Sequence, residues 1–443
     1  MTFEQFKDAC FRIALEKGCD SAEVFATKSD GFSVNVLNGE IIKYSVERSN
    51  GCNLRVLFAG KSGYAYTEVF EAPETLVDHA IDNAKAIENT DANPMQGACE
   101  YPEICVKPNP VVDLSEEEKI DLALRMERDT LAYDPRVNRM SHCSVDTGVA
   151  EVHIYNTLGL KADNKERYSY AVLGPILRDG EEEHCSYAFK FGPDIGDYGD
   201  IVKEGIENTL LQFNASSVDS GEYRILLRND AAGDLLSAFS SLFFADRVQK
   251  GLSLLKDRLG QAIASPIVSI VDDPFEADNP RAFDAEGVPS VVTNVVENGV
   301  LKSYLYNLKS ALKDGVASTS NAGRAGAASP VDTAPSNFYI EKGEKDFEAL
   351  KEALGNGLII TELSGLHAGL NPVSGDFSLI ARGLLAENGK VVRSVDQITV
   401  AGNFLALMQD IEAIGSDLRF GIPMGGRVGS PSLLIKKLIV SGK

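Results

Sequence analysis

Hydrophobic residues recur at helical spacing at the start of the chain and alternate with polar residues further along. Apolar side chains at every third or fourth position over residues 3–13 predict a helix. Thr2 and Gln5 stand at its start with the spacing of a capping box. A second helix is predicted to start at Pro73 and to continue to residue 88.

The segment between these two helices has the two-residue period of β-strands. Apolar and polar residues alternate over 32–36, and the alternation resumes over 54–58. Asn38-Gly39 is a pair that adopts positive φ in a tight hairpin. Residues 60–63 predict another turn. The first unit is therefore predicted to be a helix, a strand meander and a helix.

A second unit with the same order of elements follows a stretch rich in asparagine, proline and acidic residues. That stretch, residues 89–114, is predicted to be a linker. Ser115 and Glu118 form another capping box, which opens a helix to residue 131. Strands are predicted over 137–146, 150–155, 168–177 and 185–191, and a closing helix over 200–213. The repeated order indicates an old duplication at the level of architecture.

The rest of the chain mixes helices, strands and hairpins. A strand is predicted over 223–227 and helical sequence over 230–258. Two hairpins carry Glu-Asn-Gly at their turns, at residues 297–299 and 387–389. Further helices are predicted over 303–314, 346–354 and 403–414, each ending at a glycine that supplies a left-handed cap: Gly315, Gly355 and Gly415.

These elements predict an α+β protein, because the strands pair through hairpins and not through regular βαβ units. We expect helix–strand-meander–helix units at the N-terminus, followed by a larger mixed α/β C-terminal domain with hairpins. The predicted domains are residues 1–108, 109–222 and 223–443.

Charge narrows the possible partners. The chain has 43 basic and 65 acidic residues, a formal net charge of −22. Such a surface repels phosphate groups on average, which argues against binding nucleic acid or an anionic membrane. No apolar run approaches the ~20 residues of a membrane span, and the N-terminus lacks the pattern of a signal peptide. We therefore expect a cytoplasmic protein.

Histidine and cysteine positions argue against a metal site of a familiar kind. No two of the five histidines lie within six residues of each other, so HExxH and HExxxH are both absent. The seven cysteines are odd in number and form no CxxC pair. Two His-Cys pairs, His142-Cys143 and His184-Cys185, lie on predicted strands, where neighbouring side chains face opposite ways. A structural role is the favoured interpretation of both pairs.

Two loops are candidates for binding. The run from Asn321 to Gly326 is rich in glycine, and its Arg324 is able to hold a peptide carboxylate. A plain turn remains the alternative. His367 lies between two glycines with Asp376 nearby. The predicted peptide-binding residues are therefore Asn321, Gly323, Arg324, His367 and Asp376.

Several segments in order along the chain resemble the TldD/TldE (PmbA) family. They are Ala22–Phe25 with Asn38–Glu40, Asp284–Asn307 with its Glu-Gly-Val-Pro, Thr361–Ser378 with Ser-Gly-Asp-Phe-Ser, and Glu387–Asn403. Each match is modest alone. Their order and spacing over more than 400 residues make the resemblance specific.

The resemblance implies an empty metal site. TldD-type members carry HExxxH early in the C-terminal domain and a late cysteine as a further zinc ligand. Ser237 and Leu242 stand where the histidines would be, and Ala238 stands where the glutamate would be. The late segment, residues 420–430, has no cysteine. This pattern matches the TldE type, so we expect no catalytic residue and no metal ligand in this chain.

The resemblance also implies partners. We expect a heterodimer with a TldD-like subunit that carries HExxxH and holds the zinc, a possible homodimer without that partner, and unfolded peptides as substrates. Extended peptides bind exposed strand edges through main-chain hydrogen bonds. Two alternatives stay open: an autonomous hydrolase with an unrecognised site, built on His367 with Asp376 or on the His-Cys pairs, and a regulatory protein that acts on a macromolecule such as DNA gyrase.

Overall fold

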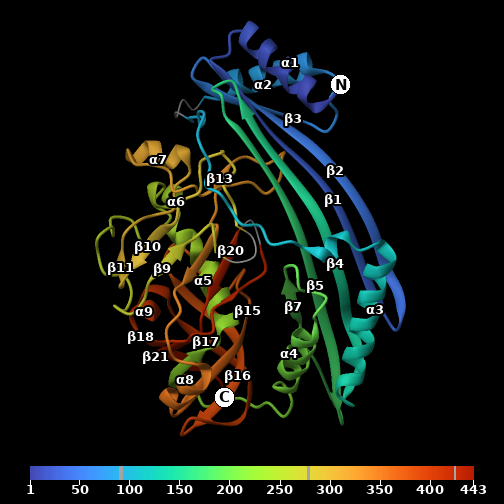
Figure 1. The fold of residues 1–443 in the computed structure, drawn as a ribbon. Helices are drawn as coiled ribbons and strands as arrows, with labels where there is room; N and C mark the ends of the chain where they lie inside the picture. Colours follow the sequence, from blue (N-terminus) through green and yellow to red (C-terminus); the bar gives the residue numbers. More distant parts are fainter. Residues whose placement is uncertain (89–92, 277–279, 424–425) are drawn as a thin grey trace. The chain divides into compact units, whose positions relative to one another are not determined.

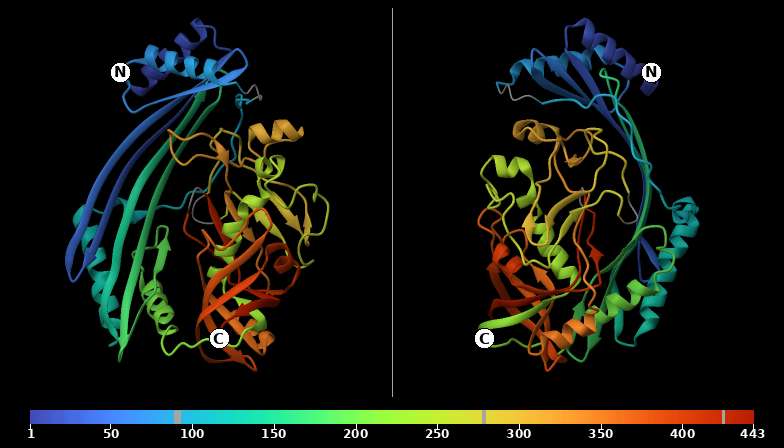
Figure 2. Two further views of the ribbon diagram at one scale, coloured as in Figure 1. Left: turned by 180° about the vertical axis from the view of Figure 1, so that it is seen from behind. Right: turned by 60° about the vertical axis from the view of Figure 1, so that its left-hand side comes forward.

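The structure is a computed structural model that describes residues 1–88, 93–276, 280–423 and 426–443. Its contacts divide the chain into two compact units (Figure 1, Figure 2). Unit 1 contains the described residues of Met1–Leu210, Asp278–Ser290 and Arg324–Val331. Unit 2 contains those of Leu211–Ala277, Val291–Gly323 and Asp332–Lys443. The three predicted domain boundaries stay a prediction.

Unit 1 is built on one antiparallel sheet of long strands (Figure 1). Among the described residues the strand order is β3-β2-β1-β4-β5-β6, and β7 also pairs with β5. The elements of unit 1 are α1 (Phe3–Glu16), β1 (Ser21–Leu37), β2 (Glu40–Phe58), β3 (Lys61–Thr67), α2 (Pro73–Ala86), η1 (Pro110–Asp113), α3 (Glu116–Tyr133), β4 (Val137–Asn156), β5 (Lys161–Asp179), β6 (Glu182–Cys185), β7 (Ala188–Phe191) and α4 (Gly199–Leu210).

The sheet crosses the border between the two predicted N-terminal units, because β1 pairs with β4 over most of its length. The predicted hairpin at Asn38-Gly39 is confirmed, with φ of 57° and 71°. The predicted break between strands 137–146 and 150–155 is wrong, since β4 continues through Gly148. A Cβ on Gly148 would lie 2.4 Å from the Tyr168 hydroxyl oxygen. The glycine therefore makes room for a cross-strand tyrosine and does not mark a turn.

Helices cover parts of this sheet. Apolar residues of α1 and α2 bury against β1, β2 and β3, while α3 packs on β4 and β1 and α4 packs on β5. Both predicted capping boxes form, at Thr2 with Gln5 and at Ser115 with Glu118. The predicted linker includes residues 89–92, which lie outside the described residues. From 93 to 109 it contains no helix or strand.

Unit 2 contains two mixed sheets. In the described part of the chain their orders are β11-β10-β9-β14-β20-β19 and β17-β16-β15-β8-β21-β18, and β17 also pairs with β21. The elements are β8 (Gly221–Leu227), α5 (Asn229–Phe239), η2 (Ser240–Phe243), α6 (Ala245–Gln249), β9 (Ile270–Asp272), β10 (Thr293–Glu297), β11 (Val300–Leu301), α7 (Leu308–Asp314), β12 (Ala322–Gly323), β13 (Asp332–Thr333), β14 (Asn337–Ile340), α8 (Phe347–Leu354), β15 (Gly357–Ser364), β16 (Asp376–Glu387), β17 (Lys390–Asn403), α9 (Phe404–Gln409), β18 (Ile411–Ile414), β19 (Arg419–Phe420), β20 (Arg427–Ser430) and β21 (Leu433–Ser441).

The α+β class is confirmed by these sheets and helices. Two helices of unit 2 are shorter than predicted. The helix predicted over 230–258 stops at Phe239, and after η2 the extended Phe244 (ψ 123°) separates it from the short α6. The helix predicted over 403–414 stops at Gln409, because residues 411–414 pair with β21. Gly415 therefore follows a strand and caps no helix.

The prediction of a helix before Gly315 is closer to the structure. The α7 helix starts at Leu308, later than predicted, because Asn307 caps its first turn by accepting a hydrogen bond from Ser310 N at 2.9 Å. Gly315 caps its end in the left-handed conformation, with φ 68°. Within the described residues, every helix falls short of the length and apolar character needed to cross a membrane.

Candidate functional site

The α5 helix carries Ser237 and Ala238, two of the three positions at which the resemblance leads us to expect a vacant metal site. It follows β8 directly, and its apolar face is buried in the main core of unit 2. Phe239 stacks on Phe404 of α9, with ring centroids 4.7 Å apart. Leu235 and Leu236 fill the same core. This packing fixes both the axial position and the rotation of the helix.

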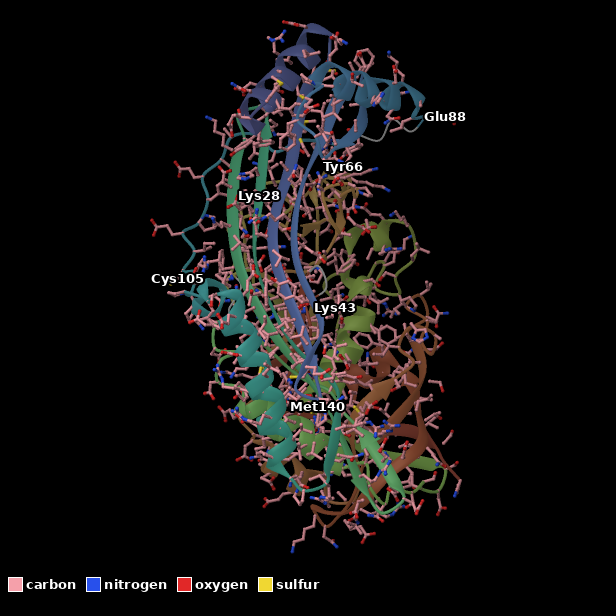
Figure 3. The ribbon with its side chains drawn as sticks, turned by 90° about the vertical axis from the view of Figure 1, so that its right-hand side faces the viewer. Lys28, Lys43, Tyr66, Glu88, Cys105 and Met140 are labelled. Carbon is pink, nitrogen blue, oxygen red and sulfur yellow. The ribbon has the colours of Figure 1, made fainter. Side chains whose placement is uncertain are left out.

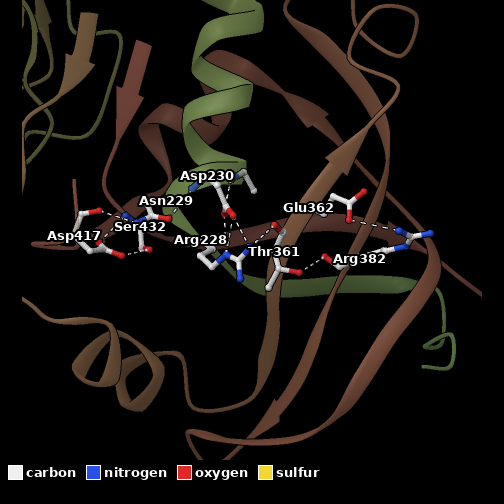
Figure 4. A network of polar contacts seen from close by, with 9 residues as sticks. Arg228, Asn229, Asp230, Thr361, Glu362, Arg382, Asp417 and Ser432 are labelled. Atoms are coloured by element: carbon white, nitrogen blue, oxygen red, sulfur yellow. Dashed lines mark hydrogen bonds and ion pairs between the residues drawn. The ribbon is translucent and has the colours of Figure 1, made fainter. Parts of the chain in front are cut away.

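Polar contacts hold the first turn of α5 in place (Figure 4). The Arg228 guanidinium pairs with the Asp230 carboxylate, with Nε 2.9 Å from Oδ1, and also donates to the carbonyl oxygen of Thr361 at 3.2 Å. Asn229 Nδ2 donates to the carbonyl oxygen of Asp417 at 2.8 Å. The Asp417 carboxylate in turn accepts from Ser432 Oγ at 2.7 Å. The start of the helix is thus tied to two neighbouring segments.

The solvent-facing side of α5 presents Asp234 and Ser237. The protein environment raises the pKa of Asp234 to about 6, first because nearby protein displaces water and second because Asp230 adds negative charge. Arg419 opposes this shift. Asp234 therefore titrates near neutral pH. A carboxyl group with such a pKa is able to exchange protons at physiological pH.

The three predicted vacant positions do not share one open face. Ser237 is exposed and Ala238 is partly buried, whereas Leu242 in η2 is 0% exposed and lies in the core of unit 2. A hydroxyl, a methyl and an isobutyl group do not fit zinc, which prefers imidazole, thiolate and carboxylate ligands. In the residues that the structure describes, no cluster of three or more His, Cys, Asp or Glu side chains is arranged to hold a metal ion.

The two His-Cys pairs occupy strands that are not adjacent, since β5 lies between β4 and β6 in the sheet. The His142 ring lies 3.0 Å from Asn35 Nδ2 and 3.0 Å from Ser144 Oγ. Burial lowers the pKa of His142 below its ordinary value. His184 Nε2 lies 3.1 Å from Glu182 Oε2. Both histidines are thus engaged by neighbours within unit 1.

The predicted peptide-binding loop is divided between the two units. Asn321 is fully buried in unit 2, where its Nδ2 donates to Asp272 Oδ2 at 2.7 Å and its Oδ1 accepts from Thr319 Oγ1 at 2.6 Å. Gly323 pairs with Asp332 in the small β12–β13 sheet. This arrangement gives Asn321 a structural role in the core of unit 2 and Gly323 a place in strand pairing. Their predicted binding role stays a prediction without support from the geometry.

Arg324 lies in unit 1 over the ring of Phe25, with Cζ 4.4 Å from the ring centroid. Its Nε and Nη1 are buried and have no hydrogen-bond partner among the described residues. Burial lowers the pKa of the Arg324 guanidinium below its ordinary value, and the nearby Glu23 opposes that change. Arg324 thus has buried donors that are unused among the described residues and suit an oxygen acceptor.

His367 and Asp376 are both exposed in unit 2. The Asp376 carboxylate accepts from Asn403 Nδ2 at 2.9 Å, and this bond holds the pKa of Asp376 below its ordinary value. The described contacts include no hydrogen bond between Asp376 and His367. The structure therefore forms no carboxylate–imidazole pair there.

Some residues of interest escaped sequence reasoning. The segment from Asp284 to Pro289 comes late in the sequence but packs in unit 1, where Gly287 O accepts from Tyr101 Oη at 3.0 Å. Asp234 was also missed. Its spacing from Asp230 and Ser237 on one helical face was the available signal. Arg419 and Glu362, which also act on its pKa, lie on other strands far along the chain.

Comparison with known proteins identifies the family. Three family models match consecutive parts of the chain: PmbA/TldA metallopeptidase domain 1 over residues 22–84, the central domain over 109–213 and the C-terminal domain over 220–442. The chain belongs to the PmbA/TldD metallopeptidase family.

Relatives within this family align over nearly the whole chain. Metalloprotease PmbA from Escherichia coli O157:H7 is 26% identical over 96% of this chain and 93% of its own length. A Thermotoga maritima protein described as a candidate modulator of a DNA gyrase is 33% identical, with a TM-score of 0.91 over 99% of this chain and all of its own. TldE from Thermococcus kodakarensis shares the fold, with 21% identity and a TM-score of 0.90 over 99% of this chain and all of its own.

Proposed function

We propose that this chain is the non-catalytic subunit of a cytoplasmic TldD/TldE-type zinc metallopeptidase that degrades or processes unfolded peptides. The observation that carries the proposal is the α5–η2 segment. On the resemblance, Ser237, Ala238 and Leu242 stand where a TldD-type chain would carry HExxxH, and Leu242 is part of the core.

The chemistry supports this proposal. A zinc peptidase needs metal ligands to bind the ion and a general base to activate the attacking water. Ala238 has no group that accepts a proton, and Leu242 has no atom that binds a metal. A partner subunit that carries HExxxH would supply both functions. The present chain would then contribute to substrate selection, through main-chain pairing with extended peptides.

An autonomous hydrolase is the weaker candidate. It was based on His367 with Asp376, but the Asp376 carboxylate is bonded to Asn403 and to no imidazole in the described structure. Asp234 provides a titratable carboxyl on α5, but no cluster of metal ligands accompanies it among the described residues. An acid without these partners does not make a peptidase.

A regulatory role on DNA gyrase is the third candidate, since one relative is described in that way. The net charge of −22 opposes direct contact with DNA. Any effect of this chain on a topoisomerase would therefore be indirect, for example through proteolysis of another polypeptide.

The composition of the complex tests the proposal. Co-expression with an HExxxH-bearing member of the family is expected to yield a 1:1 complex that contains one zinc per pair. Replacing the partner's HExxxH histidines should remove the zinc, whereas Ser237→Ala in this chain should leave the zinc content unchanged. Zinc retained by the pair after loss of the partner's histidines, but lost with Ser237→Ala, would refute the proposal.

A further inference from the structure

The sheet of unit 1 carries side chains on both of its faces (Figure 3). Where β1 and β2 pair near α1 and α2, their even-numbered residues pack in the apolar core formed with those helices. Their odd-numbered residues face the opposite side. There Glu23 stands directly opposite Arg55, and Phe25 stands directly opposite Asn53. Glu23, Arg55 and Asn53 are 1%, 2% and 4% exposed, so this face contains a group of buried polar side chains.

This group contains polar atoms that have no hydrogen-bond partner. Glu23 Oε1, Asn53 Oδ1 and Arg55 Nε are buried and form no hydrogen bond among the described residues. Arg55 Nη1 lies 3.8 Å from Glu23 Oε1, a distance that makes an ion pair but is too long for a hydrogen bond. The Arg55 guanidinium is held in place because its Nη2 donates to the carbonyl oxygen of Pro94 at 3.1 Å. A buried polar group without a partner costs free energy, so several of them together point to a ligand that pairs with them.

Arg324 adds a second positive charge to this face. Its guanidinium lies over the Phe25 ring, and its Nε and Nη1 form no hydrogen bond among the described residues. The Glu23 carboxylate attracts Arg324, and Glu286 does so less strongly, but neither forms an ion pair with it in the described part of the chain. Unlike Arg55, Arg324 is partly exposed, and the two residues that follow it are exposed. A ligand is therefore able to reach Arg324 from solvent.

The charge and the hydrogen-bonding capacity of these residues define the ligand. A buried charge is stable when it is paired, so a carboxylate is the ligand that suits the unpaired Arg324. The unpaired Oδ1 of Asn53, which stands opposite Phe25, needs an N–H donor. The last residue of a peptide presents both a carboxylate and an N–H group, whereas an inorganic anion such as sulfate presents only acceptors.

We propose that Arg324 binds the free C-terminal carboxylate of a peptide and that Asn53 Oδ1 accepts from the N–H of the same terminal residue. This carboxylate site rests on the proposed function only in taking a peptide as its ligand. It gives bound peptides one fixed direction on unit 1. Binding at this site needs neither zinc nor a partner subunit, so it is measurable separately from cleavage.

Fluorescence anisotropy tests the site with the purified full chain and an unstructured peptide labelled at its N-terminus. The free-acid peptide should bind about tenfold more tightly than its C-terminal amide. The net charge of −22 alone would favour the amide, so a preference for the acid requires a local positive site. A peptide methylated on its last amide nitrogen should also bind more weakly, because it lacks the N–H that Asn53 would accept.

Variants assign the preference to Arg324. Arg324→Gln should bind the acid and the amide equally, whereas Arg324→Lys should keep part of the preference. Arg12→Gln is the matched control, because Arg12 is an exposed arginine of α1, and it should behave as the wild type does. Circular dichroism checks that each variant is folded. No binding, equal binding of acid and amide by the wild type, or a preference that survives Arg324→Gln would overturn the proposal. Undiminished binding of the methylated peptide would overturn the role of Asn53.

Photocrosslinking locates the C-terminal end of the bound peptide. A benzophenone side chain next to the last residue should attach to the segment around Arg324 in the wild type and lose this attachment in Arg324→Gln, as read by mass spectrometry. The same group at the N-terminal end of the peptide is the control and should attach elsewhere. Attachment of the C-terminal probe away from this segment would contradict the site. If binding fails while a partner supplies the zinc, only the carboxylate site is wrong. If binding is found but this chain itself holds the zinc, only the proposed function is wrong.

Discussion

Asp272 shows how single buried polar residues hold unit 2 together. It is 1% exposed, and its carboxylate accepts from Ser336 N, Ser336 Oγ and Asn321 Nδ2 at 2.8, 2.7 and 2.7 Å. These bonds join β9 to the start of β14 and to the loop that carries Asn321. The role of Asn321 in this arrangement accounts for its burial better than contact with a ligand does.

Replacing Asp272 with alanine should therefore destabilise the protein strongly. Three buried donors would lose their acceptor, and we expect the free energy of unfolding to fall by about 3 kcal/mol. Urea denaturation measures this change. Asp332→Ala is the control, because Asp332 is exposed and its loss should cost less than about 1 kcal/mol. An equal effect of the two substitutions would contradict the assigned role of Asp272.

Asp234 should make stability depend on pH. The folded state raises the pKa of this carboxyl from its ordinary 3.8 to about 6, so the folded chain binds the proton more tightly than the unfolded chain. The resulting stabilisation of the folded state is complete below pH 3.8 and is lost as the pH rises through 6. Because part of the Asp234 side chain still reaches solvent although protein crowds its carboxyl, water screens the effect, and it should be small.

The substitution Asp234→Asn removes this titration. The melting temperature of the variant should rise relative to the wild type as the pH goes from 4 to 7.5, measured by differential scanning fluorimetry. Asp121→Asn, at an exposed position of unit 1, should show no such trend. A difference between Asp234→Asn and wild type that stays constant over this pH range would contradict the assigned environment.

At the scale of elements, local signals predicted starts and turns well but predicted lengths poorly. The capping boxes at Thr2 and Ser115 and the hairpin at Asn38-Gly39 depend on residues only a few positions apart. The end of α9 at Gln409 depends on β21, which lies far along the chain. A sequence pattern read over a short window cannot show that a distant strand will pair with residues that could otherwise continue the helix.

The α5–η2 segment is the element on which the functional account depends, and two substitutions probe it. Ser237→His places an imidazole on the exposed face and should change the free energy of unfolding by less than about 0.5 kcal/mol. Leu242→His places it in the core without a partner and should cost about 2–4 kcal/mol. Chemical denaturation of both variants measures this contrast. Equal tolerance of the two would show that position 242 faces an open site after all.

At the scale of the whole molecule, the order of the matching segments predicted the family, and the family models confirm it. The vacancy expected at positions 237, 238 and 242 rests on the resemblance and stays a prediction. The separation of Asn321 from Arg324 was not predicted, because it results from a chain that passes between two units. Residues three positions apart thus lie in different units. A local sequence pattern cannot predict this division.

The central claim is that this chain needs a catalytic partner, and peptidase activity tests it most directly. An unstructured fluorogenic peptide would be incubated with the purified chain, with a purified HExxxH-bearing partner, and with both together. We predict no cleavage by this chain alone, strong cleavage by the mixture, and no cleavage when the partner's HExxxH histidines are replaced. Chelator-sensitive cleavage by this chain alone would contradict the account.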